Sequence, residues 1–299
     1  MQTNGGHLIK YLRKKNGVTQ AQLAEKLFIS QRMLSNIEKG DAKLNIIDFK
    51  VAFATLGVAI EEDFWVVYLS EAEFEGYLQY TEIIQLLDGG GHTGKLQAMY
   101  DALAANPLAK YPLINRFLSY ISVIVDKETP DNEKLTTLYA TLRETNEHFE
   151  DEKITQYRLN FNEALIVHQI ALTHARLGQC SKAIALLDGV VQNIESLRTT
   201  AAENLVLLPK LYTDLAVLLV EAAEYERAVP ICESALMAAR THKSMWLGST
   251  AAYLWGVCYY KLNKSAQEYM PLLTMAYHSA VGFRQNDLAD KIRKEYDVQ

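Results

Sequence analysis

Side chains that donate hydrogen bonds recur along one stretch of the chain, TQAQLAEKLFISQRMLSNIEKG at residues 19–40. If residues 31–39 form a helix, the apolar Leu34 and Ile37 face one way and the donors face the other. The donors on that outer face are Gln31, Arg32, Ser35, Asn36 and Lys39. Amide, hydroxyl and cationic groups of this kind bind phosphates and the base edges of the DNA major groove. The pattern therefore predicts a DNA-binding surface.

Two helices joined by a tight turn would hold these donors on the outside of a compact unit. The side chains predicted to face its interior are Leu23, Leu27, Ile29, Leu34 and Ile37. Ala24 is small where the first helix must let the second pass closely, and Ser30 stands where a serine caps a helix. This arrangement is a helix-turn-helix, whose second helix enters the major groove by its N-terminal end. The alternative is an ordinary helical hairpin with a solvated polar face.

The charge distribution favours the DNA-binding alternative. The whole chain carries a net charge of −6. Residues 1–57 nevertheless hold nine Lys or Arg against four Asp or Glu, a balance of +5, and the remainder holds 21 against 32, a balance of −11. A basic head on an acidic body indicates that only the head meets a polyanion.

The rest of the sequence predicts an all-α protein of two domains. Apolar residues recur with the 3.6-residue period of a helix throughout the 299 residues, and 49% of the chain is apolar. The helices lengthen and acidity rises after about residue 66, so we expect a DNA-binding domain at 1–66 and a second domain at 67–299. Helix-ending glycines are expected at Gly17, Gly40 and Gly57, and N-caps at Ser30, Asn45 and Ser70.

Cysteine usage and hydropathy predict a soluble cytoplasmic protein. Cys180, Cys232 and Cys258 are far apart within apolar helical runs, which favours buried thiols over metal ligands or nucleophiles. The longest unbroken apolar runs, such as residues 215–220, are far too short to span a bilayer. The N-terminus has no apolar segment of the signal-peptide type.

The C-terminal half repeats itself. IALTHARLGQCSKAIALLDGVV at 170–191 aligns with LAVLLVEAAEYERAVPICESAL at 215–236, which pairs Ala171 with Ala216 and Ala183 with Ala228. In a third copy, WGVCYYKLNKSAQEYMPLLTMA at 255–276, Gly256 is the first small residue and Glu268 replaces the second. Small residues recur in this way where paired helices approach closely. The pattern resembles the tetratricopeptide repeat, with longer helices, and implies a right-handed helical-repeat domain. Residues 70–150 align only loosely with it.

The first helices of tandem pairs line an inner surface that suits an extended peptide. The repeat alignment predicts that this surface carries His168, Arg176, Lys210, Thr213, Tyr253 and Tyr260, with Asn160 and Asn204 on the same helices. The mixture of donors, cations and aromatic rings fits a short peptide, because its backbone needs hydrogen-bond partners. Ordinary packing or plain surface is the alternative for each residue taken singly.

Residues 8–57 resemble the lambda-repressor-like, or XRE-type, DNA-binding domain. The likeness rests on LRKKNGVTQAQLAEKLFISQRMLSNIEKG, in which Arg13 and Glu38 match the arginine and glutamate that pair between helices 1 and 3. The resemblance implies that Gln20 and Gln31 hold phosphates and that Arg32, Ser35 and Asn36 read bases, with Ser30 and Lys39 in the same interface. Phe28 departs from the family at a turn position that is usually glycine.

The combination of this head with a helical-repeat body resembles the peptide-responsive quorum-sensing regulators of Gram-positive bacteria, the RRNPP group. The resemblance implies a cytoplasmic, homodimeric transcription regulator whose repeat domain binds a short signalling peptide and thereby shifts the placement of its DNA-binding heads. A second hypothesis keeps the helix-turn-helix regulator but gives the repeat domain a protein partner, or dimerisation alone, and no peptide.

A third hypothesis, an enzyme or phosphotransfer protein, rests on GGGHTGKL at residues 89–96. Gly89, Gly94 and Lys95 have the spacing of a phosphate-binding loop, but that motif needs a preceding strand and a hydroxyl residue after the lysine. Here TEIIQLLD has the pattern of a helix, and Leu96 takes the hydroxyl position. We therefore expect a glycine loop between helices, with no catalysis and no cofactor. The histidines show no spacing typical of metal ligands.

Overall fold

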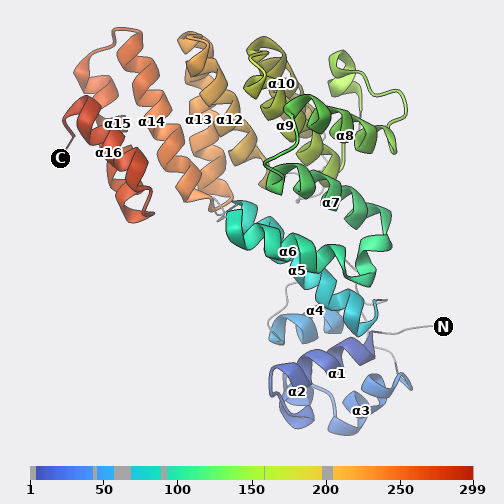
Figure 1. The fold of residues 1–299 in the computed structure, drawn as a ribbon. Coiled ribbons are helices and arrows are strands. Elements are labelled where there is room, and N and C mark those ends of the chain that lie inside the picture. The colour runs from blue at the N-terminus through green and yellow to red at the C-terminus, as the bar shows by residue number, and fades with distance from the viewer. Residues whose placement is uncertain are drawn as a thin grey trace. The chain divides into compact units, whose positions relative to one another are not determined.

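A computed structural model describes residues 5–42, 46–56, 69–88, 93–157, 159–196 and 205–298. Every regular element of these residues is a helix, which confirms the all-α prediction. The chain divides into two compact units (Figure 1). We call them the head unit, Met1–Ile84 with Gln97–Ile114, and the repeat unit, Gln85–Leu96 with Asn115–Gln299. The predicted domain boundary at residue 66 falls outside the described residues and stays a prediction.

The head unit begins with helices whose ends follow from local sequence. They are α1 (Gly6–Lys15), α2 (Gln20–Lys26), α3 (Gln31–Lys39) and α4 (Ile46–Thr55). Thr19 and Gln22 form a capping box before α2, and the Ser30 side chain accepts a hydrogen bond from the Met33 amide at 3.1 Å. Gly17 and Gly40 have positive φ and end α1 and α3, as predicted. The predicted sites Asn45 and Gly57 lie outside the described residues.

Close backbone approach organises the head core. The described side chains with at most 2% exposure include Leu8, Ile9, Leu12, Leu23, Ala24, Leu34 and Ile37. A Cβ atom on Gly6 would lie 1.9 Å from the carbonyl oxygen of Ile37, so α1 packs directly on the backbone of α3. Of the predicted inward residues, Ile29 alone is half-buried, because it lies in the turn. The interior predicted for this motif is therefore confirmed.

Three further elements complete the description of this part of the chain: α5 (Glu71–Asp88), α6 (Thr93–Ala104) and the 3-10 helix η2 (Pro107–Lys110). Ser70 caps α5 as predicted, and its amide donates to Glu73 Oε2 at 2.9 Å in return. The segment before the glycine loop is helical, and Lys95 lies in the first turn of α6. The strand that a phosphate-binding loop requires is therefore replaced by a helix here; Gly89 is outside the described residues.

The repeat unit consists of successive helical hairpins that lie side by side in Figure 1. Its elements are α7 (Pro112–Val125), α8 (Asp131–Arg143), η3 (Asp151–Gln156), α9 (Phe161–Arg176), α10 (Cys180–Ser196), α12 (Leu208–Glu221), α13 (Tyr225–Thr241), α14 (Met245–Lys261), α15 (Ala266–Gly282) and α16 (Asn286–Tyr296). Helices α9 and α10, α12 and α13, and α14 and α15 pack as the predicted pairs. The helical-repeat prediction is confirmed.

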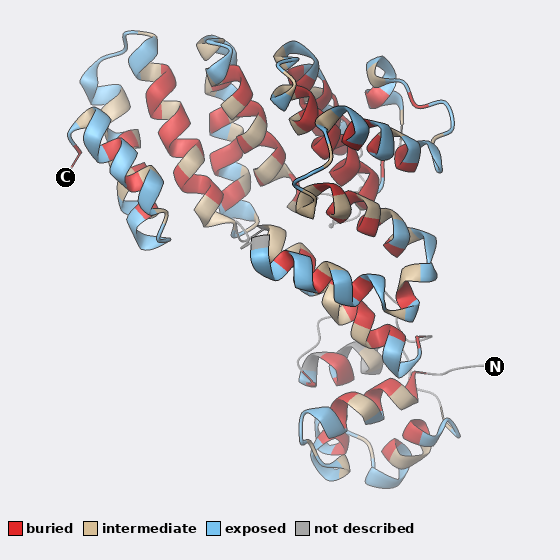
Figure 2. Cartoon of the chain, in the orientation of Figure 1, coloured by how far each residue is buried: buried red, intermediate tan, exposed pale blue. Residues whose placement is uncertain are grey.

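Small residues sit where the paired helices meet. Ala171 and Ala216 are fully buried on α9 and α12. A Cβ atom on Gly256 would lie 2.7 Å from Leu273 Cδ2, so α14 and α15 need a glycine there. Figure 2 shows the resulting band of buried residues along α9, α10, α12 and α14. The predicted role of the small residues is confirmed.

The alignment of the third copy with Glu268 was wrong by one residue. Glu268 is exposed and forms a capping box with Ser265 at the start of α15. Ala183 and Ala228 each lie three residues after the first residue of their helix, and the equivalent position in α15 is Tyr269. Prolines 230 and 271 share this register. The turn between α14 and α15 is one residue longer than the others, which displaced the alignment.

Two predictions from composition are also settled for the described residues. Cys232 and Cys258 are buried, as expected, whereas Cys180 is only half-buried because it begins α10. Among the helices described, none is both long and apolar enough to cross a membrane.

Several helix turns in the repeat unit hold one residue in a left-handed backbone conformation. After α9 that residue is Gly178, with φ 77°, and after α12 it is Ala223, with φ 58°. A Cβ atom disfavours this conformation by roughly 1–2 kcal/mol. We expect Ala223→Gly to raise the free energy of unfolding by about 0.5–1 kcal/mol, measured by urea denaturation.

The neighbouring alanine is a matched control. Ala222 is equally exposed but has φ −77°, which any residue adopts. Ala222→Gly should therefore lower the free energy of unfolding by about 0.5–1 kcal/mol. Glycine loses more chain entropy than alanine on folding, and no left-handed strain is relieved at this position. Equal effects of the two substitutions would contradict the strain assigned to Ala223.

Candidate nucleic-acid interface and candidate ligand-binding face

Helix α3 separates its polar and apolar side chains as the sequence predicted. Leu34 and Ile37 are fully buried, while Gln31, Arg32 and Lys39 are exposed. Ser35 and Asn36 are half-buried between these two faces. The backbone carbonyl of Asn36 accepts a hydrogen bond from the Asp41 amide at 2.8 Å, which holds the end of the helix. The structure thus brings the predicted donors together on one face, although their contacts with DNA stay a prediction.

A buried ion pair fixes α3 against the helices beneath it. Arg13 on α1 donates to both carboxylate oxygens of Glu38, from Nε at 2.6 Å and from Nη2 at 2.9 Å. The side chains retain only 11% and 2% of their exposure. Arg13 Nη1 also donates to the Val18 carbonyl at 3.0 Å. The pairing implied by the family resemblance is therefore present, and it is buried.

Gln20 joins this pair. Its Nε2 donates to Glu38 Oε2 at 2.8 Å, so one carboxylate collects donors from both α1 and α2. Burial raises the pKa of Glu38, but the hydrogen bonds from Arg13 and Gln20 outweigh it and hold that pKa below its usual value. Part of the Gln20 amide is thus committed to the interior. Its predicted phosphate contact would have to use the remaining groups.

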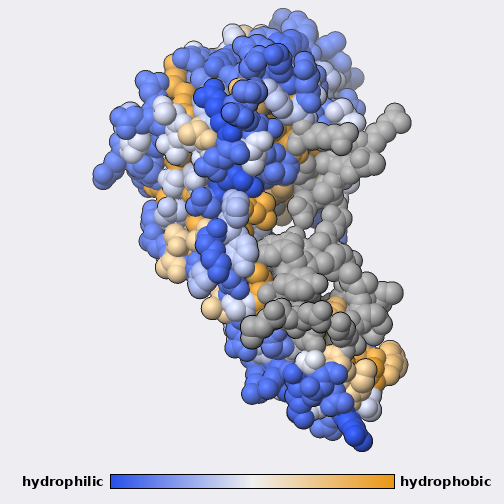
Figure 3. Space-filling model, turned by 90° about the vertical axis from the view of Figure 1, so that its right-hand side faces the viewer, coloured by the Kyte–Doolittle hydropathy of each residue, from blue (hydrophilic) through white to orange (hydrophobic). Residues whose placement is uncertain are grey.

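Phe28 occupies the glycine position of the turn in a left-handed conformation. Its φ is 54° and it is 96% exposed, so the ring contributes little packing to the head. The Ile29 amide still donates to the Ala24 carbonyl at 3.0 Å, which preserves the turn. Figure 3 shows apolar atoms on the described surface of this unit, where Met33 and Val51 are also exposed. The departure from the family pattern therefore leaves the helix-turn-helix intact.

The first helices of successive pairs form a second candidate site. His168 on α9 is 2% exposed, and its Nε2 lies 2.7 Å from Asp214 Oδ2 on α12. Burial raises the pKa of Asp214, but the hydrogen bond with His168 outweighs it and lowers that pKa below its usual value. Lys210, half-buried on the same helix, adds to the lowering. The bond shows that α9 and α12 lie side by side on one face.

Several residues predicted to bind a peptide already have partners within the chain. Asn160 caps α9, accepting from the Glu163 amide at 3.1 Å. The Thr213 hydroxyl is buried and donates to the Pro209 carbonyl at 2.6 Å. Arg176 is exposed and pairs with Asp131 on α8, with Nη2 2.9 Å from Oδ1. Asn204 lies outside the described residues. Their role in binding a ligand stays a prediction.

The two predicted tyrosines on α14 are covered in part by α16. Tyr253 is 7% exposed; its hydroxyl lies 3.5 Å from Glu295 Oε2, and Lys291 Nζ lies 5.2 Å from its ring centroid. Burial, together with the Glu295 carboxylate, raises the pKa of Tyr253 to about 12. Tyr260 is 47% exposed and packs edge-on against Tyr296. Only one end of this aromatic pair is therefore open to solvent.

The sequence did not predict the residues of the chain that bond to His168 and Tyr253. Asp214 is one example, although the 45-residue repeat places it one position beyond the equivalent of His168. The contacts of Glu295 and Lys291 could not be predicted from the repeats, because α16 follows the last repeat and has no counterpart in the others. The predicted residues that keep accessible surface are Asn160, Arg176 and Tyr260, which are exposed, and Lys210, which is half-buried.

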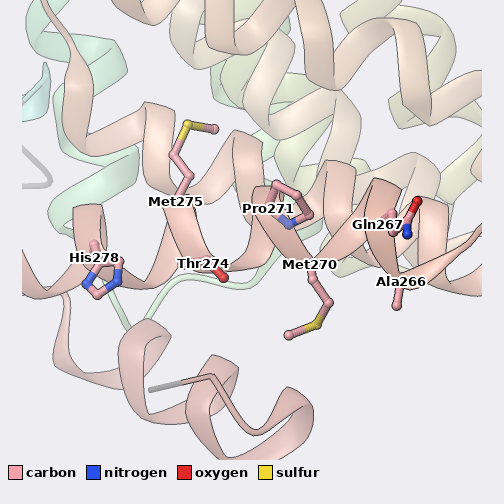
Figure 4. Close-up of a pocket in the computed structure, with 7 residues that line it drawn as sticks. All are labelled: Ala266, Gln267, Met270, Pro271, Thr274, Met275 and His278. Atoms are coloured by element: carbon pink, nitrogen blue, oxygen red, sulfur yellow. The ribbon is translucent and has the colours of Figure 1, made fainter.

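A shallow groove runs along one helix outside both candidate sites (Figure 4). The residues that line it are Ala266, Gln267, Met270, Pro271, Thr274, Met275 and His278, all on α15. These positions repeat every turn of a single helix face. None belongs to the predicted peptide-binding set, whose described members lie on α9, α12 and α14 or, for Asn160, at the N-cap of α9.

The fold and the head site together define a helix-turn-helix protein with a helical-repeat unit. Residues 9–62 match the helix-turn-helix family. No curated protein matches the sequence significantly. Among solved structures, the chain is similar to PlcR of Bacillus thuringiensis in complex with the peptide PapR7 and DNA. That match has a TM-score of 0.66 and 20% identity, and covers 97% of this chain and 99% of PlcR.

Two streptococcal proteins have the same architecture. ComR from Streptococcus vestibularis, in complex with its cognate signalling peptide XIP, matches with a TM-score of 0.54 and 14% identity over 99% of this chain and 98% of ComR. Rgg2, the SHP pheromone receptor of Streptococcus dysgalactiae, matches with a TM-score of 0.50 and 15% identity over 98% of each chain. At these identities the likeness establishes the fold. The predicted resemblance to the RRNPP architecture is confirmed at that level.

The Arg13–Glu38 pair gives a test of what holds the head together. Removing one charge from a buried pair leaves the other uncompensated, which typically costs about 3–5 kcal/mol. We expect Glu38→Gln to lower the free energy of unfolding of the head by that order. The exposed Lys15–Glu75 pair, at 2.8 Å, is the control. Glu75→Gln should cost under about 1 kcal/mol.

The pH dependence of the same pair follows from the lowered pKa of Glu38. Its stabilisation is present above the unfolded-state pKa, about 4.3, and is lost as pH falls through the folded-state value. The stability difference between wild type and Glu38→Gln should therefore be largest near neutral pH and shrink below about pH 4. A difference that does not vary with pH would contradict an ionised Glu38.

Proposed function

We propose that this protein is a sequence-specific DNA-binding transcription regulator whose repeat unit senses a short signalling peptide. The observation that carries the proposal is a helix-turn-helix match at residues 9–62 within a chain that has the PlcR fold over 97% of its length. PlcR and ComR were each solved with a signalling or partner peptide. The proposal extends that ligand class to this chain.

The DNA-binding part is supported by the presentation of α3. Its inner side chains are buried and its end is anchored through Glu38, so the helix is a rigid platform for groups that point outward. Gln31 and Lys39 suit phosphates, whereas Arg32 and Asn36 can make bidentate contacts with guanine and adenine edges. The N-terminal end of α3 enters the major groove, as in other helix-turn-helix proteins.

The peptide-binding part is supported by the first helices of the repeat unit. The His168–Asp214 bond places α9 beside α12, and α12 contacts α14, so the three helices form one face. Arg176, Lys210 and Tyr260 offer two cations and a ring on those helices. A peptide carboxylate and an apolar side chain would find complementary partners there.

The protein acts in the cytoplasm as a homodimer in this proposal, and it works by binding rather than by catalysis. Two heads in one dimer would contact half-sites whose spacing is set by the DNA helix. A peptide then changes DNA occupancy only if it binds one arrangement of the dimer better than another. The alternative retains DNA binding but replaces the peptide with a protein partner, or leaves the repeat unit to dimerise.

Base recognition is tested by Arg32→Ala and Asn36→Ala in the full chain. A binding site would first be selected from random DNA, and affinities for that site and for random DNA compared by fluorescence anisotropy. Each substitution should reduce the preference for the selected site by about 1–3 kcal/mol if it removes a bidentate base contact. Arg293→Ala, which removes an exposed arginine on α16, should leave both affinities unchanged.

The two DNAs distinguish the possible outcomes for α3. Equal losses on selected and random DNA would show that Arg32 and Asn36 contact only the backbone. Wild-type binding by the double variant would exclude α3 as the recognition helix. Binding to random DNA should weaken steeply with salt concentration, because phosphate contacts release counterions.

Peptide sensing is tested by native mass spectrometry of the purified full chain, followed by calorimetry with any peptide that is retained. Lys210→Ala combined with Tyr260→Ala should weaken that peptide at least tenfold, about 1.4 kcal/mol. Both side chains keep accessible surface, so the fold should survive. Lys261→Ala combined with Tyr225→Ala removes the same side-chain types at other positions and should have no effect.

If the peptide proposal fails, the DNA-binding proposal can still hold. If no peptide is retained and none alters DNA affinity, the repeat unit binds a protein partner or only dimerises. Selected-site DNA binding by the same preparation would then still support the regulator. Loss of both activities would overturn the whole proposal.

A further inference from the structure

Two buried cysteines meet between successive helix pairs. Cys232 lies on α13, the second helix of one pair, and Cys258 lies on α14, the first helix of the next. Both residues are 0% exposed, and their thiols share a hydrogen bond. The third cysteine, Cys180, is half-buried at the start of α10. None of the three has a role in the proposed binding of DNA or peptide.

The packing of α13 on α14 explains why the thiols touch. A Cβ atom on Gly248 would lie 3.6 Å from Leu236 Cδ1 and 3.7 Å from Ala239 Cβ, so the helices approach closely at that end. The helices run antiparallel, and the contact therefore moves backward along α13 as it moves forward along α14. Further along the same contact, Cys232 on α13 and Cys258 on α14 are both fully buried. We call this contact line the α13–α14 seam.

We propose that Cys232 and Cys258 form a reversible disulfide when the protein meets a hydroperoxide, joining two successive helix pairs covalently. One thiolate attacks the peroxide oxygen, forms a sulfenic acid and releases an alcohol, or water if the oxidant is hydrogen peroxide. The other thiol then attacks the sulfenic sulfur, the S–S bond forms and water leaves. Two thiols lose two electrons, and the hydroperoxide takes them up.

The two thiols share one hydrogen bond, which together with burial raises the pKa of Cys232 and which lowers the pKa of Cys258. Either sulfur can attack the peroxide, and the other then resolves the sulfenic acid. A resolving thiol already in contact with the attacking one closes the disulfide before the sulfenic acid is oxidised further.

Burial makes the pair slow to react and selective for small oxidants. Alkylating reagents should modify Cys180 first in the native protein, because it alone is partly accessible. A peroxide reaches the seam only when α13 and α14 open locally. Disulfides in reducing compartments are usually transient and redox-sensing, which fits a bond that forms under peroxide and is reduced afterwards.

The test counts thiols in the full chain. The protein is treated with hydrogen peroxide, denatured, alkylated with iodoacetamide and weighed by mass spectrometry. The expected result is one alkylated cysteine of three, returning to three after dithiothreitol, with a cross-linked fragment that contains residues 232 and 258. The Cys180→Ser variant should give no alkylated cysteine after peroxide and two after dithiothreitol.

Cys232→Ala and Cys258→Ala complete the experiment, since each should abolish the cross-link and leave a stable sulfenic or sulfinic acid at the remaining partner. Because these positions are buried, wild type and Cys180→Ser decide the matter if either alanine variant fails to fold. Three free thiols after peroxide, a cross-link that includes Cys180, or sulfinic acid as the sole wild-type product would each overturn the proposal. The readout involves neither DNA nor peptide, so its failure is separate from that of the proposed function.

Discussion

The buried contact between Arg13 and Glu38 is the constraint on which the head depends. One carboxylate, 2% exposed, receives two hydrogen bonds from α1 and one from Gln20 on α2, while its own backbone belongs to α3. Three helices therefore share a single charged group. Because Glu38 and the outward-facing Lys39 are adjacent on α3, any rotation of that helix that exposed the glutamate would also turn away the side chains predicted to contact DNA. The contacts of Glu38 that stabilise the core therefore also fix the orientation of the outward-facing donors on α3.

In the repeat unit, the helices pack closely through small residues rather than through a buried ion pair. Ala171, Ala216 and Gly256 let paired helices approach until backbone and side chains touch, and the α13–α14 seam follows the same rule. Polar links are added between pairs, of which His168 with Asp214 is the clearest. Packing between successive pairs is as extensive as packing within them, since α13 packs on α14 as α12 packs on α13. The repeat unit is thus a continuous array in which each pair is supported by its neighbours.

Local chemistry explains how much of this was predictable from the sequence. Some features act within a few residues and can be predicted from a single sequence. They include capping residues such as Ser30, positive-φ glycines such as Gly40 and the apolar spacing of α3. The extra residue in the turn before α15 could not be predicted in this way. The sequence alone does not show whether Glu268 or Tyr269 takes the position equivalent to Ala183 and Ala228. Contacts of α16 with Tyr253 are also beyond such reasoning, since no repeat supplies a template for that helix. The inner face therefore stays a prediction, to which the structure adds partners within the chain for several of its residues.

Those internal partners divide the candidate ligand contacts into two kinds. Lys210 and Tyr260 keep accessible surface, so a peptide that binds them gains affinity without disturbing the fold. His168 and Tyr253 are already bonded to Asp214 and Glu295, so a ligand that takes either of them must first break a link between helices. Binding of the first kind leaves the existing links between helices in place. Binding of the second kind exchanges such a link for a contact with the ligand, so its free energy differs between arrangements of the helix pairs, and a regulator needs such a difference to change its affinity for DNA. The residues least available to a ligand in this structure are thus the ones through which a ligand could act.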